Sequence, residues 1–123
     1  MTASRSTSIP DIATALNRLL TTVKWLDNGR IADFDNNVHL AEAVSEIRGQ
    51  ATPHTYIQKI RQGTIRDPRA SVIWAIGQVL SERACIDITP DYFYVPATRV
   101  RIDRALDLEL DSLSLRHRGR PPV

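Results

Sequence analysis

Hydrophobic residues recur at helical spacing in four successive stretches of the chain. In the first stretch the apolar positions lie three or four residues apart, at Ile12, Leu16, Leu19, Leu20 and Val23. Residues with this period line one face of a helix. Ser8, Pro10 and Asp11 combine a hydroxyl cap, a first-turn proline and an acid, which is typical of a helix N-terminus. We therefore expect a first helix that ends near Val23 or Lys24.

The stretch from Lys24 to Asn37 is less regular. Its Asp-Asn-Gly sequence at residues 27–29 is a strong turn signal between two apolar aromatics, Trp25 and Phe34. A short hairpin or a loop held by these aromatics would satisfy this pattern, and we prefer the loop. Two aspartates nearby suggest calcium ligands, but no glycine and no closing glutamate falls at the spacing of a calcium loop.

The second and third helices are bounded by start and stop signals. Asn37 can cap the second helix and Gly49 ends it, with Leu40, Val44 and Ile47 as the buried stripe. The third helix opens at Thr52-Pro53, a capping residue followed by a proline at the first helical position. It ends at Gly63, because glycine suits the left-handed conformation that follows a helix. Its inward positions are Tyr56, Ile57 and Ile60.

The fourth helix is expected to be the most buried element. It follows a second cap-plus-proline pair, Asp67-Pro68, and its apolar arc is wide: Val72, Ile73, Ile76, Val79 and Leu80. A short turn at residues 88–93 then closes the domain with aromatic packing. Four helices with a short turn between the second and the third predict an all-α fold.

A fifth, C-terminal helix over residues 96–117 is predicted to join two copies of the chain. One apolar stripe comprises Ile102, Leu106, Leu110 and Leu113, and Leu108 lies nearly opposite. A helix that is apolar on two faces can bury one against its own domain and the other against a partner. Basic residues precede acidic ones along it, an order that suits antiparallel pairing. We expect this stripe to mediate a homodimer; packing back on its own domain is the alternative.

The composition excludes several classes of protein. The chain has 123 residues, 42% of them hydrophobic, which predicts one compact domain. A single cysteine, Cys85, and three scattered histidines exclude a disulfide framework and a Cys/His metal site. The longest apolar run, residues 72–80, is far short of a membrane span. With no leader segment and no nucleophile–base or carboxylate pair at catalytic spacing, we expect a cytoplasmic protein that is not an enzyme and needs no cofactor.

The charge of the chain is unevenly placed. Sixteen basic and fourteen acidic residues leave a net charge of +2. Residues 47–69, however, hold five basic residues and one acid, between a segment of −4 (residues 27–46) and one of −2 (residues 70–95). A basic block in one element is what nucleic-acid binding needs, and a solvated helix face is the alternative. Fourteen of the basic residues are arginine, which favours contacts with phosphate and with guanine edges.

The basic block coincides with the predicted third helix, whose outer face is polar. With Ile57 and Ile60 turned inward, the outward side chains include His54, Thr55, Gln58 and Lys59. Glutamine can bond adenine in a bidentate manner, and lysine or histidine can reach guanine acceptors in the major groove. The residues that flank the helix and suit phosphate contacts are Arg48, Thr64, Arg66 and Arg69.

Three segments resemble a known family. TPHTYIQKIRQGTIRDPRASVIWAIGQVL resembles the recognition helix, Arg-x-Gly turn and fourth helix of XRE-type (Cro/repressor-like) helix-turn-helix regulators. ITPDYFY resembles the element that often closes that domain, and ATALNRLLTTV resembles the first helix of the actinobacterial EspR-like regulators, which are nucleoid-associated dimers. The resemblance implies a lambda-repressor-like fold that binds double-stranded DNA. It places base readers at His54, Thr55, Gln58 and Lys59, and phosphate contacts at Thr52, Thr64, Arg66 and Arg69.

The expected organisation follows from these segments. Residues 1–8 are a disordered start, 9–95 the helix-turn-helix domain, 96–117 the dimerisation helix and 118–123 a basic tail. Within the tail, Arg118, Gly119 and Arg120 resemble the core of an AT-hook, which lies extended in a narrow minor groove; a disordered basic tail is the alternative. The sequence thus predicts a nucleoid-associated transcriptional regulator that binds DNA as a homodimer. The alternative is a protein-interaction module such as an antitoxin or adaptor.

Overall fold

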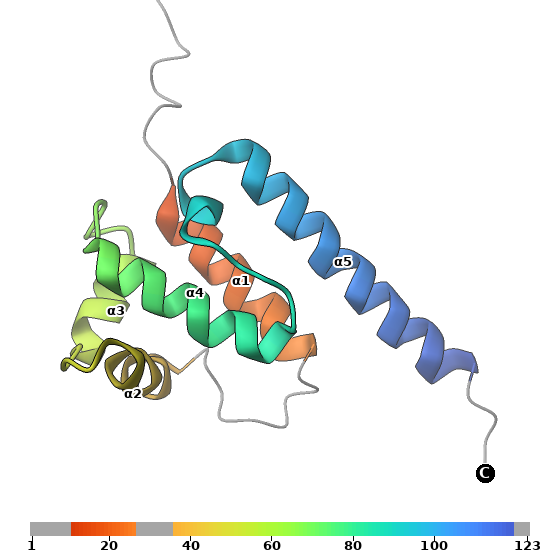
Figure 1. Ribbon diagram of the computed structural model, residues 1–123, viewed down its shortest axis with the longest axis horizontal. Coiled ribbons are helices and arrows are strands. Elements are labelled where there is room, and N and C mark those ends of the chain that lie inside the picture. Colours follow the sequence, from red (N-terminus) through yellow and green to blue (C-terminus); the bar gives the residue numbers. More distant parts are fainter. Residues whose placement is uncertain (1–10, 27–35, 120–123) are drawn as a thin grey trace, which may run out of the picture.

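The computed structural model describes residues 11–26 and 36–119, apart from the side chains of residues 24–26 and 113–119 (Figure 1). Its elements are α1 (Ile12–Leu26), α2 (Asn37–Arg48), α3 (His54–Arg61), α4 (Ala70–Ala84), the short 3₁₀ helix η2 (Pro90–Phe93) and α5 (Pro96–Gly119). These residues contain no strand, so the predicted all-α fold is confirmed. The predicted disordered start and the choice between hairpin and loop at residues 27–35 lie outside the described residues.

Side chains just before α1 and α2 cap these helices. The Asp11 carboxylate accepts hydrogen bonds from the backbone nitrogen (3.1 Å) and the hydroxyl (2.6 Å) of Thr14, and the two bonds lower the pKa of Asp11. The Asn36 side chain accepts from the backbone nitrogens of Val38 (2.8 Å) and His39 (3.3 Å). The cap of α2 is therefore one residue earlier than predicted, because the side chain must precede the free N–H groups that it satisfies.

The helix ends follow the glycine signals. Gly49 and Gly63 have φ angles of 69° and 81°, in the left-handed region, as predicted for the ends of the second and third helices. At the end of α4 the same role falls to Cys85, with φ of 56°, which is uncommon for a residue that has a Cβ. Helix α1 continues to Leu26, beyond its predicted end, and α4 begins at Ala70, two residues after the predicted Asp67-Pro68 start.

The buried side chains form one core to which every helix contributes. Helix α4 contributes more buried residues than any other helix, as its wide apolar arc predicts: Val72, Ile73, Ala75, Ile76, Gly77, Val79, Leu80 and Ala84. Tyr92 and Phe93 of η2 are fully buried, and their rings pack edge to face with centroids 5.2 Å apart. The predicted aromatic turn is therefore confirmed. It closes the core between α4 and α5.

Polar contacts at η2 hold the first half of α5 in place. Nε and Nη2 of Arg99 donate to the carbonyl oxygens of Tyr92 and Phe93, both at 3.0 Å. The Tyr92 hydroxyl donates to Oδ1 of Asp103 at 2.7 Å, and Asp103 also lies 3.9 Å from the guanidinium of Arg18 on α1. Burial and the Asp103 carboxylate raise the pKa of Tyr92, so its hydroxyl remains a donor at neutral pH.

The apolar stripe of α5 packs against its own chain. Ile102 and Leu106 are each 1% exposed, and the helix lies against α1 and η2. This corrects the prediction that these two residues face a second copy, because both side chains are already covered by the domain. Leu110 is half-buried, and the side chain of Leu113 is not among those described. Residues 96–106 thus belong to the same folded unit as α1–α4, whereas the second half of α5 extends beyond the other helices (Figure 1).

Candidate nucleic-acid interface

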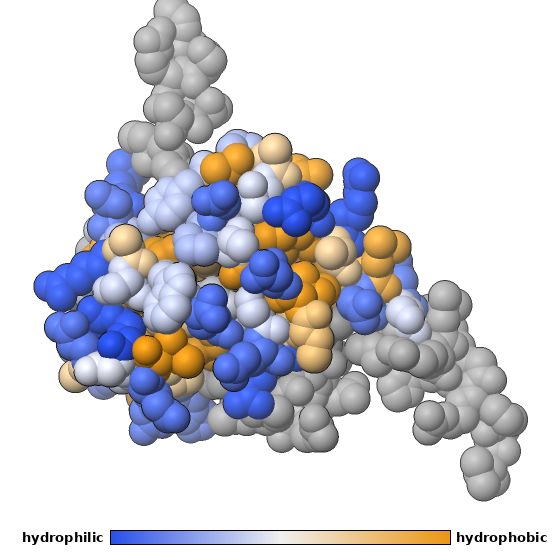
Figure 2. Space-filling model, viewed as in Figure 1, coloured by the Kyte–Doolittle hydropathy of each residue, from blue (hydrophilic) through white to orange (hydrophobic). Residues whose placement is uncertain are grey.

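Helix α3 buries one face and exposes the other. Ile57 and Ile60 are fully buried beside α1 and α2. All four predicted base readers on the outer face are exposed: His54, Thr55, Gln58 and Lys59. The α3 side of the molecule lies away from α5, and its surface at the left of Figure 2 is mostly hydrophilic. The predicted exposure of this row is confirmed, and contact with bases stays a prediction.

Arg61 ties the C-terminal end of α3 to two other helices. Its Nε donates to Oδ1 of Asn17 in α1 at 2.6 Å, and its Nη1 donates to Oδ1 of Asn37 in α2 at 2.9 Å. The Asn17 amide in turn donates to the Arg61 carbonyl oxygen at 3.1 Å. Because one guanidinium joins α1, α2 and α3, the helix is held in a defined orientation. Arg61 therefore serves the fold, although the sequence places it in the basic block.

Thr52 is part of the segment that joins α2 to α3, and it is only 6% exposed. Its backbone nitrogen donates to Oγ of Ser45 at 2.8 Å, and its hydroxyl oxygen accepts a hydrogen bond from Nη1 of Arg48. The Thr52 side chain is therefore held within the fold and is less exposed than the other predicted phosphate contacts, and its contact with a phosphate stays a prediction. Helix α3 starts after Pro53. The hydrogen bonds of Thr52 to Ser45 and Arg48 hold the segment between α2 and α3 against α2.

The turn between α3 and α4 presents the other predicted phosphate contacts. Thr64, Arg66 and Arg69 are all exposed there. The turn is anchored at both ends, since the backbone nitrogen of Thr64 donates to the Lys59 carbonyl oxygen (2.9 Å) and that of Arg69 donates to the Tyr56 hydroxyl (2.8 Å). These three side chains therefore project from a well-positioned backbone beside the outer row of α3.

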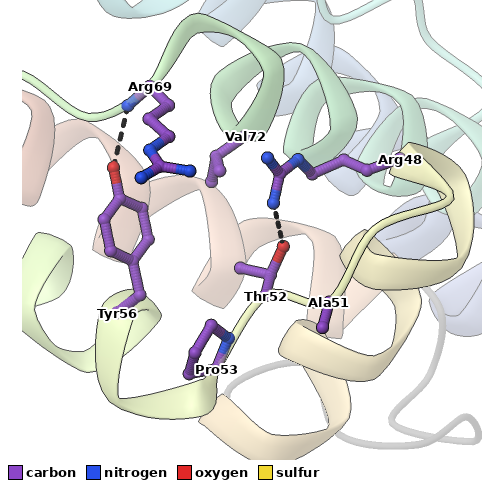
Figure 3. A pocket seen from close by; sticks show the side chains of 7 residues that line it. All are labelled: Arg48, Ala51, Thr52, Pro53, Tyr56, Arg69 and Val72. Carbon is purple, nitrogen blue, oxygen red and sulfur yellow. Dashed lines mark hydrogen bonds between the residues drawn. The ribbon is translucent and has the colours of Figure 1, made fainter.

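A hollow of about 210 Å³ lies between the α2–α3 segment and the first turn of α4 (Figure 3). The guanidinium groups of Arg48 and Arg69 point into it from opposite sides. No acidic residue lines it; the lining residues are Arg48, Ala51, Thr52, Pro53, Tyr56, Arg69 and Val72. Sequence reasoning placed Arg48 and Arg69 beside the third helix but gave no sign that they share a cavity.

Arg48 is held at this hollow by neutral groups only. Its Nε donates to Oγ of Ser71 at 3.2 Å, and its two terminal nitrogens donate to Oγ1 of Thr52 and, at 3.5 Å, to Oε1 of Gln50. Within the described ranges, neither Arg48 nor Arg69 has a carboxylate at ion-pair distance. The Arg48 guanidinium is therefore positioned by the fold, and within these ranges neither positive charge is neutralised by an ion pair.

Comparison with known proteins gives no match for this chain. No family model, no curated protein and no solved structure matches it. Residues 11–26 and 36–119 contain no group of three or more His, Cys, Asp or Glu side chains that could hold a metal ion. None of the helices in these residues has the length and apolar character needed to span a membrane.

The predicted minor-groove tail begins inside a helix. Arg118 and Gly119 are the last two residues of α5, so their backbone is helical and not extended. Arg120 lies outside the described residues. Among the described side chains of this helix two large apolar residues are exposed, Val100 (58%) and Leu108 (63%), and Leu108 projects from the side opposite to the buried stripe.

Proposed function

We propose that this protein binds double-stranded DNA as a helix-turn-helix transcriptional regulator of the XRE type. The observation that carries the proposal is the outer row of α3, where four polar side chains are exposed on a helix whose inner face is locked into the core. An α-helix with its side chains is about 10–12 Å across, which matches the width of about 12 Å of the major groove. The α2–α3 pair, joined by a short segment that begins with Gly49, supports the same assignment.

Each exposed group has a matching partner on DNA. Gln58 and Lys59 offer the amide and ammonium groups that read adenine and guanine edges, and His54 and Thr55 occupy the N-terminal turn that usually enters deepest. Thr64, Arg66 and Arg69 stand beside the row, where they can contact the phosphates that flank the groove. The mechanism is groove insertion with phosphate clamps, and it includes no chemical step.

Binding to duplex DNA is expected to weaken steeply with salt. Of the five basic residues in the basic block, Arg61 is engaged within the fold and is not counted. The four that remain beside the outer face of α3 are Arg48, Lys59, Arg66 and Arg69. If each neutralises one phosphate, the slope of log affinity against log salt is about −3 to −4 per protomer. Fluorescence anisotropy with a labelled duplex over a salt series measures this slope.

A different result would favour the protein-interaction module. If no duplex is bound even at low salt, and a stoichiometric protein partner copurifies with the chain, α3 is a protein-binding surface.

A DNA-binding regulator can act as an architectural protein or as a local repressor. Genome-wide binding of the purified protein distinguishes these two roles, because many A·T-rich sites indicate an architectural protein and a few palindromes indicate a local repressor.

We also propose that two copies associate through the outer face of α5. Leu108 is an exposed apolar residue on this face, with Arg104 one turn before it and Asp111 one turn after it, both exposed. If two such helices pair antiparallel about Leu108, Arg104 meets Asp111 of the partner subunit, and the contact occurs twice. Opposite charges thus favour a second copy of the same chain as the occupant.

A charge swap tests this pairing. Light scattering is expected to show a dimer at micromolar concentration, and Arg104→Asp is expected to shift it towards monomer because four carboxylates then face each other. Adding Asp111→Arg restores opposite charges and is expected to restore the dimer. A monomeric unaltered chain, or a dimer that neither variant disturbs, would refute the α5 interface.

A further inference from the structure

We propose that the hollow between Arg48 and Arg69 is a binding site for a phosphate group. Figure 3 shows the two guanidinium groups converging on this hollow from the end of α2 and the start of α4. Guanidinium groups present N–H donors in a planar fork that matches the oxygen atoms of phosphate. The site is an open hollow lined by α2, the segment between α2 and α3, α3 and the start of α4, and its lining residues differ from the exposed row on α3.

The charge balance of the hollow favours an anion. Two like charges that point into one cavity repel each other, and none of the lining residues is acidic. Arg48 is half-buried, and all its hydrogen-bond partners are neutral oxygens, those of Ser71, Thr52 and Gln50. A bound dianion would remove the repulsion and supply the missing counter-charge.

The donors are already oriented for a ligand. Three hydrogen bonds fix the Arg48 guanidinium and leave N–H groups on its terminal nitrogens unused. The Tyr56 hydroxyl accepts from the backbone of Arg69, so its own hydrogen remains for another acceptor. Helix α4 begins at this hollow without a side-chain cap, and its first N–H groups add positive potential. The Arg48 side chain therefore loses little conformational entropy when an anion binds.

The rest of the lining suggests an ester of phosphate over the free ion. Ala51, Pro53 and Val72 form apolar walls, and the volume of about 210 Å³ leaves room for a group attached to the phosphate. Two sources share this chemistry: a phosphate of the DNA backbone beside the groove that α3 enters, or a small phosphorylated molecule. In its DNA form the inference rests on the function proposed above, whereas binding of a small phosphate does not.

The first experiment uses inorganic phosphate alone. Sodium phosphate is titrated into the ¹⁵N-labelled full chain at constant ionic strength, with chloride as the balancing salt, and the Nε–H signals of Arg48 and Arg69 are followed by NMR. We expect saturable shifts of both signals in the millimolar range. Arg69→Gln is expected to weaken this binding about tenfold or more, because one charge-assisted contact is lost. Arg101→Gln removes an equal charge from an exposed site on α5 and should change nothing.

The second experiment measures duplex binding by the same two variants. If the phosphate comes from DNA, Arg69→Gln weakens duplex binding about tenfold and makes the salt slope shallower by about one, while Arg101→Gln does neither. If the ligand is a small phosphate ester, phosphate still shifts both arginine signals of the unaltered chain in an Arg69-dependent manner, and both variants bind duplex as the unaltered chain does. Either result supports the site.

Two outcomes separate failure of this inference from failure of the proposed function. If duplex is bound through α3 but Arg69→Gln has no effect and phosphate shifts neither arginine signal beyond the chloride control, the hollow is not a phosphate site. If phosphate binds in an Arg69-dependent manner but no duplex is bound, the site stands and the DNA-binding function is wrong. Arg48→Lys, which keeps the charge but loses the fork, gives a second variant if Arg69→Gln fails to fold.

Discussion

Replacing Gln58 and Lys59 together by alanine is expected to weaken duplex binding at least 30-fold and to remove most of its sequence preference. Each good base contact contributes about 1–3 kcal/mol of discrimination, so two lost contacts reach that factor at the lower bound. Both side chains are exposed on α3 and make no hydrogen bond within the described structure, so the free energy of unfolding should change by less than about 0.5 kcal/mol.

Anisotropy titrations with a selected duplex and with a scrambled one measure the two effects. The matched control is Gln78→Ala with Arg101→Ala, which removes one amide and one positive charge from α4 and α5, away from α3. The control should bind both duplexes as the unaltered chain does. Wild-type affinity and preference in the Gln58/Lys59 variant would mean that α3 does not read DNA, whatever else the protein binds.

Replacing Tyr92 by alanine is expected to lower the free energy of unfolding by about 3–5 kcal/mol, a large share of the stability of a domain of this size. The Tyr92 side chain is fully buried, its ring packs on Phe93, and its hydroxyl bonds Asp103 on α5. Its loss leaves both a cavity and a half-buried carboxylate without its hydroxyl partner. Urea denaturation followed by circular dichroism measures the change.

Tyr92→Phe separates the two contributions. The phenylalanine ring fills the same space and loses only the hydrogen bond to Asp103, which is expected to contribute about 1.5–3 kcal/mol because the acceptor is charged. The alanine variant should therefore be clearly less stable than the phenylalanine variant. Equal losses in the two variants would show that the ring contributes nothing to the core and that only the hydroxyl matters.

Local patterns predicted the features that depend on local geometry. The 3.6-residue period of apolar positions predicted α1 to α4, and the glycines at 49 and 63 marked two helix ends, because a helix face and a left-handed residue are properties of neighbouring residues. The exposed row on α3 followed from the same period. Its inner residues, Ile57 and Ile60, are buried as the spacing requires.

The errors concern residues whose roles depend on how the elements pack in space. Thr52 reads as the cap of the third helix, but Pro53 occupies that position, and the Thr52 hydroxyl accepts a hydrogen bond from Arg48. Ile102 reads as part of an interface between copies. The apolar stripe on its helix does not show whether the residues that bury it belong to the same chain or to a second copy. Gly77 lies inside a helix for a reason visible only in space, since a Cβ there would lie 2.7 Å from the carbonyl oxygen of Ile88.

The hollow between Arg48 and Arg69 could not have been found from spacing. The two arginines belong to different helices, and their convergence depends on how the start of α4 packs beside the α2–α3 segment. The distribution of charge along the sequence did place both arginines in one basic block, and this is the feature of the site that the sequence alone predicts. Their shared cavity is a tertiary property.

The contact between α1 and α5 has a consequence for synthesis of the chain. The two helices come from opposite ends of the described chain, and Ile102 and Leu106 complete the core beside α1. Ribosomes add about 5–20 residues per second, so the chain between residues 26 and 106 takes about 4–16 s to make. During that interval the apolar face of α1 lacks its final cover. The core can therefore close completely only after residues 102–106 have been synthesised.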